Sequence, residues 1–151
     1  MQTSRLVIPQ PLLQKMLEHC LDERPCEACG ILAGRDGHVT SAYATDNTRH
    51  SPVYYEVEPT QQEQALKQMA EQHEELVAIY HSHPTAPAKP SQNDIRMAVH
   101  YPEAVRVIIS LDGPAEVRAF RINGWKVEEI GLAAPVTAEG HWHDLRRQET
   151  E

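Results

Sequence analysis

Aromatic side chains are scarce in this sequence of 151 residues, which has only two Trp, five Tyr and one Phe. A core built by such a chain must consist mainly of aliphatic side chains. Basic residues are also few, since 14 Lys and Arg stand against 22 Asp and Glu, and the formal net charge is −8. Because phosphate binding requires a concentrated basic surface, this balance argues against nucleic acid as a partner.

Long hydrophobic runs are absent too. No stretch approaches the roughly 20 apolar residues of a transmembrane helix, and residues 1–5 lack the pattern of a signal peptide. We therefore expect a cytoplasmic protein with no membrane partner. The three cysteines, Cys20, Cys26 and Cys29, are an odd number, which predicts no disulfide framework in a reducing compartment.

The order of apolar and polar segments predicts an α+β fold with a curved, mostly antiparallel sheet and three helices. We expect helices over residues 11–23, 61–75 and 91–100, the second of them capped by Thr60. Strands are expected at residues 5–9, 28–34, 38–45, 53–59, 76–83, 104–111, 115–122 and 125–130.

The length fits one domain, for which we predict the boundaries 1–131. Periodicity fades after Gly131, so residues 132–151 are expected to form a loosely ordered C-terminal tail.

The segment YHSHPTAPAKPSQND, residues 80–94, contains the most informative pattern. Side chains alternate along a strand, so His81 and His83 point to the same side, about 7 Å apart. Zinc binds histidine nitrogen and carboxylate oxygen, and a catalytic zinc site uses three protein ligands and one open position. His81, His83 and Asp94 would supply these three ligands. The proline-rich residues 84–90 hold the two halves of the pattern in one geometry at low entropic cost.

Each part of this pattern also has an ordinary structural explanation. An isolated His-x-His is a weak signal, and Ser91-x-x-Asp94 is a capping box that begins a helix. A capping box and a role in a metal site are compatible for Ser91 and Asp94, because a helix start holds both residues in a fixed place. Glu27 precedes the apolar strand at 28–34, where it is either a desolvated general base or a solvated strand-end carboxylate.

Two further patterns are weaker candidates. Cys26-x-x-Cys29 lacks the second pair of a zinc ribbon and leads into a strand rather than a helix. His141-x-His143 lies in the expected tail without a carboxylate on an element of fixed geometry.

Two stretches, EACGILAG (27–34) and HSHPTAPAKPSQND (81–94), together resemble the JAMM motif of the MPN-plus (Mov34/PAD-1-like) zinc metallopeptidases. The likeness extends over residues 5–130 and is greatest to small prokaryotic members that act on ubiquitin-like sulfur-carrier proteins. It implies the MPN/JAMM, cytidine-deaminase-like fold and one Zn²⁺ per chain, bound by His81, His83 and Asp94. It further implies that Glu27 is the general base and then the acid, and that Ser91 stabilises the oxyanion.

The reaction implied by the resemblance is hydrolysis of the amide bond after the C-terminal glycine of a ubiquitin-like or sulfur-carrier protein. Releasing cysteine, trimming a C-terminal extension and removing a modifier from lysine use the same chemistry, so the sequence leaves all three open. The resemblance makes a homodimer plausible, and the substrate-binding residues stay unknown. Two alternatives are a non-catalytic MPN scaffold module and a RadC-like protein.

Overall fold

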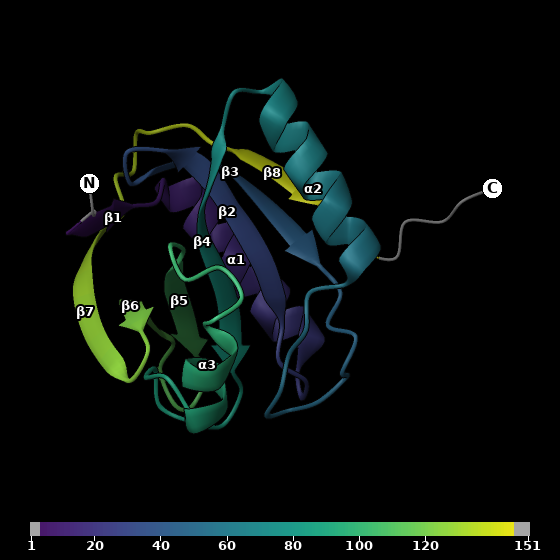
Figure 1. The fold of residues 1–151 in the computed structure, drawn as a ribbon, viewed down its shortest axis with the longest axis vertical. Helices are drawn as coiled ribbons and strands as arrows, with labels where there is room; N and C mark the ends of the chain where they lie inside the picture. Colours follow the sequence, from purple (N-terminus) through teal and green to yellow (C-terminus); the bar gives the residue numbers. More distant parts are fainter. Residues whose placement is uncertain (1–3, 147–151) are drawn as a thin grey trace.

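A computed structural model describes residues 4–146, which form eight strands and three helices (Figure 1). In chain order these are β1 (Arg5–Val7), α1 (Gln10–Glu23), β2 (Cys29–Arg35), β3 (His38–Thr45), α2 (Pro59–Glu71), β4 (Glu75–His83), α3 (Gln92–Met97), β5 (Val105–Ser110), β6 (Glu116–Asn123), β7 (Lys126–Ala133) and β8 (His141–Asp144). The predicted α+β class and three helices are confirmed.

The strands form one sheet in the order β1-β7-β6-β5-β4-β2-β3-β8, and β1 also pairs with the start of β3. Because β1 contacts both β7 and β3, the sheet curves until it closes on itself (Figure 1). It is more mixed than predicted, since β1–β3, β1–β7, β3–β8 and β4–β5 are parallel pairs. Parallel pairing of β4 and β5 is possible because residues 84–104, including α3, give the chain room to cross over.

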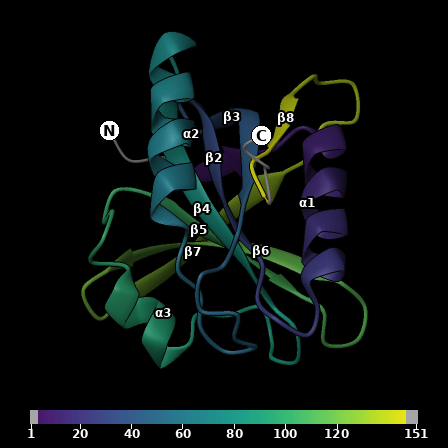
Figure 2. The same cartoon turned by 90° about the vertical axis from the view of Figure 1, so that its right-hand side faces the viewer.

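The helices α1 and α2 lie on opposite sides of the sheet (Figure 2). Alternation along β2 accounts for this arrangement, because successive side chains point to opposite faces. Leu32 packs in the cluster that includes Leu12 and Met16 of α1, whereas Ile31 packs in the cluster that includes Met69 of α2. The core is largely aliphatic, as the shortage of aromatic residues predicted.

The prediction of a strand at residues 53–59 is wrong. This segment is a loop whose single β-bridge joins Val57 to Asn47. The buried Asn47 side chain organises the loop: Oδ1 accepts the N–H groups of Arg49 and Glu56, and Nδ2 donates to the Tyr54 carbonyl. These bonds take the backbone groups that a strand would have offered to a neighbour.

The start of α2 also differs from the prediction. Its N-cap is Glu58, whose side chain accepts the N–H groups of Thr60 and Gln61, so Thr60 lies inside the first turn. Pro59 occupies the first helical position, where its missing N–H costs nothing.

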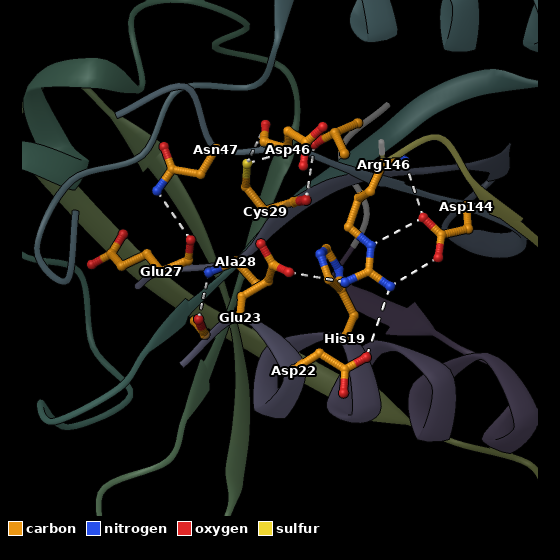
Figure 3. Close-up of polar contacts among 12 residues, drawn as sticks. His19, Asp22, Glu23, Glu27, Ala28, Cys29, Asp46, Asn47, Asp144 and Arg146 are labelled. Atoms are coloured by element: carbon orange, nitrogen blue, oxygen red, sulfur yellow. Dashed lines mark hydrogen bonds and ion pairs between the residues drawn. The ribbon is translucent and has the colours of Figure 1, made fainter. Parts of the chain in front are cut away.

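The expectation of a loosely ordered tail is wrong for residues 141–146, and β7 itself continues past Gly131 to Ala133. The strand β8 pairs in parallel with β3, and the side chain of Leu145 is buried. Arg146 binds Glu23 of α1 at 3.1 Å and Asp144 at 2.8 Å (Figure 3). Residues 147–151 lie outside the described part of the chain. Across residues 4–146, no helix has both the length and the apolar character required to span a membrane.

Gly30 allows a close approach that fixes the centre of the sheet, where it pairs with Tyr80. A Cβ atom at Gly30 would lie 2.3 Å from the Tyr80 ring, whose hydroxyl is hydrogen-bonded to buried His19 at 2.7 Å. We therefore expect Gly30→Ala to lower the free energy of unfolding by about 1–3 kcal/mol through overpacking, as measured by urea denaturation.

Gly131→Ala is the matched control, because the nearest atom of residues 4–146 to its added Cβ would be the Cγ of Arg5, at 3.4 Å. Equal stability of the two variants would contradict this explanation of Gly30.

Candidate active site

The end of β4 brings two imidazoles to one side of the sheet. His81 and His83 are both buried, and Ser82 between them faces the opposite way. Ser82 fixes the strand against the start of β2 with two hydrogen bonds, because its Oγ accepts the Ala28 N–H at 2.8 Å and its N–H donates to the Ala28 carbonyl at 3.0 Å. The paired strands thus hold both histidines beside the segment that carries Glu27.

Three potential ligand atoms converge at this point. His81 Nε2 and His83 Nε2 lie 3.1 Å and 3.0 Å from Asp94 Oδ2, and the two nitrogens are 3.2 Å apart. Atoms that bind a tetrahedral zinc ion at about 2.0–2.1 Å lie about 3.3–3.4 Å from one another. The triangle is therefore close to the size that zinc requires, and its nitrogen and oxygen donors match the preference of that ion.

The tautomer of His83 also suits a metal ligand. Its Nδ1 lies 2.8 Å from the Pro87 carbonyl, which can only accept a hydrogen bond. Nδ1 therefore carries a proton, which leaves Nε2, facing Asp94, as the potential ligand atom. Burial opposes protonation of this ring, but its hydrogen bonds to Asp94 and Pro87 raise the pKa of His83 in the metal-free protein. Burial lowers the pKa of His81, which favours the neutral, ligating form of that imidazole.

Asp94 is held by the capping box that begins α3. Its N–H donates to Ser91 Oγ, and its Oδ2 accepts the Ser91 N–H, each at 3.0 Å. The ordinary explanation of Ser91-x-x-Asp94 is thus confirmed, and the same carboxylate faces both histidines. Burial opposes its ionisation, yet the imidazoles and the Ser91 N–H hold the pKa of Asp94 well below its usual range.

Glu27 is buried next to this group, in the segment between α1 and β2. Its N–H donates to the Ser51 carbonyl, and its own carbonyl accepts Asn47 Nδ2 at 3.0 Å (Figure 3). Burial raises the pKa of its carboxyl group to about 8; the Asp94 charge adds to this effect and His83 opposes it. Its Oε1 is buried and has no hydrogen-bond partner within residues 4–146.

Sequence reasoning missed two residues around this site. Asn47 anchors the backbone of Glu27, and its place in a polar loop was the only signal, since Asn commonly bonds to nearby backbone. Tyr55 stacks on His81 with ring centroids 4.4 Å apart, a contact for which the sequence offers no signal.

The weaker sequence patterns contribute no atom to this ligand set. His143 stacks on Tyr43, with ring centroids 4.6 Å apart, where β8 pairs with β3. Cys29 is buried, its thiol lies 3.5 Å from Thr45 Oγ1, and burial raises its pKa to about 12, which suppresses thiolate chemistry. Within residues 4–146, the metal-ligand geometry occurs only at His81, His83 and Asp94.

Comparison with known proteins relates the chain to peptidases. A family profile of prokaryotic homologues of the JAB domain matches residues 9–123. A CysO-cysteine peptidase of Mycobacterium tuberculosis is 34% identical over 132 residues, covering 82% of this chain and 87% of that protein. A probable TtuB-protein conjugate cleaving protease of Thermus thermophilus is 40% identical over 119 residues, 76% and 74% of the two chains.

A solved structure shows the same fold with related sequence. It is a protein from Desulfitobacterium hafniense with a TM-score of 0.77 and 30% identity, and the match covers 97% of this chain and 95% of that one.

The raised pKa of Glu27 predicts a specific pH dependence of stability in metal-free protein. An acid with a raised pKa binds its proton more tightly when folded, so its contribution is present below its ordinary pKa and lost as the pH rises. We expect this contribution to disappear between about pH 4.5 and pH 8. Glu27→Gln should lack it and be more stable than the wild type above pH 8, as measured by urea denaturation with a chelator.

The control is Glu63→Gln, which changes an exposed glutamate of α2. The prediction fails if wild type and Glu27→Gln show parallel stability curves across this pH range.

Proposed function

Because this chain belongs to the family of prokaryotic homologues of the JAB domain, we propose that it is a zinc-dependent metallopeptidase. The family resemblance predicted from the sequence is thereby confirmed. The substrate would be a ubiquitin-like or sulfur-carrier protein, cut at the amide bond after its C-terminal glycine. The observation that carries the proposal is the convergence of three ligand atoms beside a buried carboxyl group.

The metal ligands in this proposal are His81, His83 and Asp94, which would hold one Zn²⁺ per chain. A zinc ion supplies Lewis acidity, both to a substrate carbonyl and to water. The protein's contribution is a rigid and buried ligand set: β4 is tied to β2, and Asp94 is fixed by the first turn of α3.

Glu27 is the proposed general base, which then returns the proton to the leaving amine. Burial brings the pKa of its carboxyl group to about 8, close to the range that suits proton transfer at neutral pH. A cation held by His81, His83 and Asp94 would favour the carboxylate form of Glu27, the form that accepts a proton. Its unpaired Oε1 is free to bind the water that gives up that proton.

Ser91 is the proposed donor to the oxyanion of the tetrahedral intermediate. Its Oγ already accepts the Asp94 N–H, which leaves the hydroxyl hydrogen free to donate. Ser91 is exposed to solvent while Asp94 is buried, so a substrate carbonyl can reach the hydroxyl. A donor that points at developing negative charge stabilises the transition state more than the ground state.

The relatives support a carrier-type substrate, because one is a CysO-cysteine peptidase and another is a probable TtuB-protein conjugate cleaving protease. Release of cysteine, trimming of an extension and removal of a modifier from lysine all stay possible for this chain. The complete ligand set argues against a non-catalytic MPN scaffold, and the acidic charge argues against a RadC-like protein. The cytoplasmic location and a homodimer stay predictions from the sequence.

Metal content and cleavage together test the proposal. We expect wild-type protein to contain one zinc ion per chain by elemental analysis, and to cleave a sulfur-carrier protein with a C-terminal extension after its terminal glycine, as seen by intact mass. His83→Ala should lose both properties, because it removes one of three ligands.

Glu27→Gln is the matched variant, since it should keep the zinc ion and lose cleavage. Unchanged hydrolysis by Glu27→Gln would contradict the mechanism, and zinc-free wild-type protein would contradict the metal centre.

Ser91→Ala separates substrate activation from metal binding. We expect kcat to fall about 100-fold, the usual cost of removing one oxyanion donor. The zinc content should stay at one per chain because Ser91 is not a ligand. The loss of the cap should lower the free energy of unfolding by about 1 kcal/mol. Ser91→Thr keeps the hydroxyl group and should retain most of the activity; if it matched Ser91→Ala, the hydroxyl would have no such role.

A further inference from the structure

The two histidines of the candidate metal centre are held in different ways. His83 is anchored by the hydrogen bond from its Nδ1 to the Pro87 carbonyl. Nδ1 of His81 is also buried, but no group within residues 4–146 forms a hydrogen bond with it. A hydrogen bond on the second ring nitrogen is the usual means of orienting a metal-binding imidazole. Besides the contact of Nε2 with Asp94, the orientation of the His81 ring therefore depends on packing.

The packing partner of His81 is the ring of Tyr55. The two rings are stacked, with centroids 4.4 Å apart and planes inclined by 21°. His83, in contrast, meets His81 nearly edge-on, at an interplanar angle of 60°. Stacking restricts rotation of the His81 ring about its χ2 angle, because any large rotation would drive the imidazole into the tyrosine. The plane of the ring determines where the Nε2 lone pair points.

Tyr55 is itself held in place from two directions. On one side, Asn47 bonds to the carbonyl of the adjacent Tyr54 and to the N–H of Glu56. On the other side lies Arg106, which pairs with Ile79 on β4, two residues before His81, and therefore projects from the same face of the sheet.

Arg106 is a rigid support because it is buried and its guanidinium group donates four hydrogen bonds to backbone carbonyls. Nη1 donates to the carbonyls of Tyr101 and Ala104, and Nη2 donates to those of Ala98 and His100. Burial lowers the pKa of Arg106, while interaction with the Tyr55 hydroxyl opposes this effect. The cation thus ties the segment after α3 to the tyrosine that covers His81.

We propose that Tyr55 is a positioning residue that sets the orientation of His81 for metal binding, with Asn47 and Arg106 holding its ring in place. The proposal rests on the metal centre proposed above and adds a residue that binds no metal. It makes the affinity of the site depend on the loop between β3 and α2, which contributes none of the ligands. A tyrosine that only filled space beside the cavity of about 480 Å³ lined by Tyr55 and Arg106 would affect stability without affecting the metal.

The test is titration of metal-free protein with Co²⁺, followed by the visible absorption of the bound ion. Losing a residue that orients a ligand typically weakens metal affinity by about 10–100-fold. We expect Tyr55→Leu to weaken Co²⁺ binding by about 10-fold and to change the absorption spectrum, which reports the coordination geometry. Tyr55→Phe keeps the stacked ring but loses the hydroxyl that interacts with Arg106, so it should weaken Co²⁺ binding less than Tyr55→Leu does.

Tyr54→Leu is the matched control, because Tyr54 is the neighbouring residue, is 49% exposed and contributes only backbone bonds to the loop. Tyr55→Met is a second variant without a ring, for use if the branched leucine side chain prevents folding. Circular dichroism at the titration temperature verifies that each variant is folded.

The outcomes separate the two proposals. Wild-type affinity and spectrum in folded Tyr55→Leu or Tyr55→Met would overturn the positioning role and leave the metal centre intact. Equal weakening in Tyr55→Phe would also overturn it, because the ring would then not be the part that matters. Failure of the wild type to bind Co²⁺ would refute the metal centre and this inference with it.

Discussion

The antiparallel register of β2 and β4 is the constraint on which the site depends. Cys29 lies opposite His81, and Ala28 exchanges two hydrogen bonds with Ser82. Glu27 is therefore placed next to the histidines by backbone pairing rather than by contacts of its own side chain. A slip of one residue would turn His81 and His83 to the opposite face of the sheet and separate them from Asp94. Gly30 protects this register by leaving space for the Tyr80 ring on the face of the sheet that α1 covers.

Stability and function use the same groups at this site. The capping box of α3 satisfies backbone N–H groups that any helix start must satisfy, and it also delivers a carboxylate to two imidazoles. Gathering these groups in a buried place has a cost, which is visible in the raised pKa of Glu27 and in its unpaired oxygen. Such unfavourable burial of polar groups is expected where a site is built for a ligand or a reaction rather than for stability alone.

Local sequence patterns predicted most of the fold and the candidate ligands. Helices α1 and α2 and the central strands follow from apolar periodicity, and the His-x-His and Ser-x-x-Asp spacings depend only on strand alternation and helix capping. The errors lie where the decisive contacts are distant in sequence. β8 forms because β3 offers an edge for pairing, and the loop before α2 is shaped by Asn47. Tyr55 could not be found for the same reason, since its partner is an imidazole on another strand.

The closure of the sheet by β1 and β7 has a consequence for biosynthesis. β1 leaves the ribosome well before its parallel partner at Gly131–Ala133, which lies more than a hundred residues later in the chain. Glu27, His81, His83 and Asp94 all precede that partner in the chain. A nascent polypeptide therefore carries every candidate ligand while the edge of the sheet is still unpaired and open to other chains. The time needed to synthesise the chain up to β7 therefore sets how long this edge stays open to other chains.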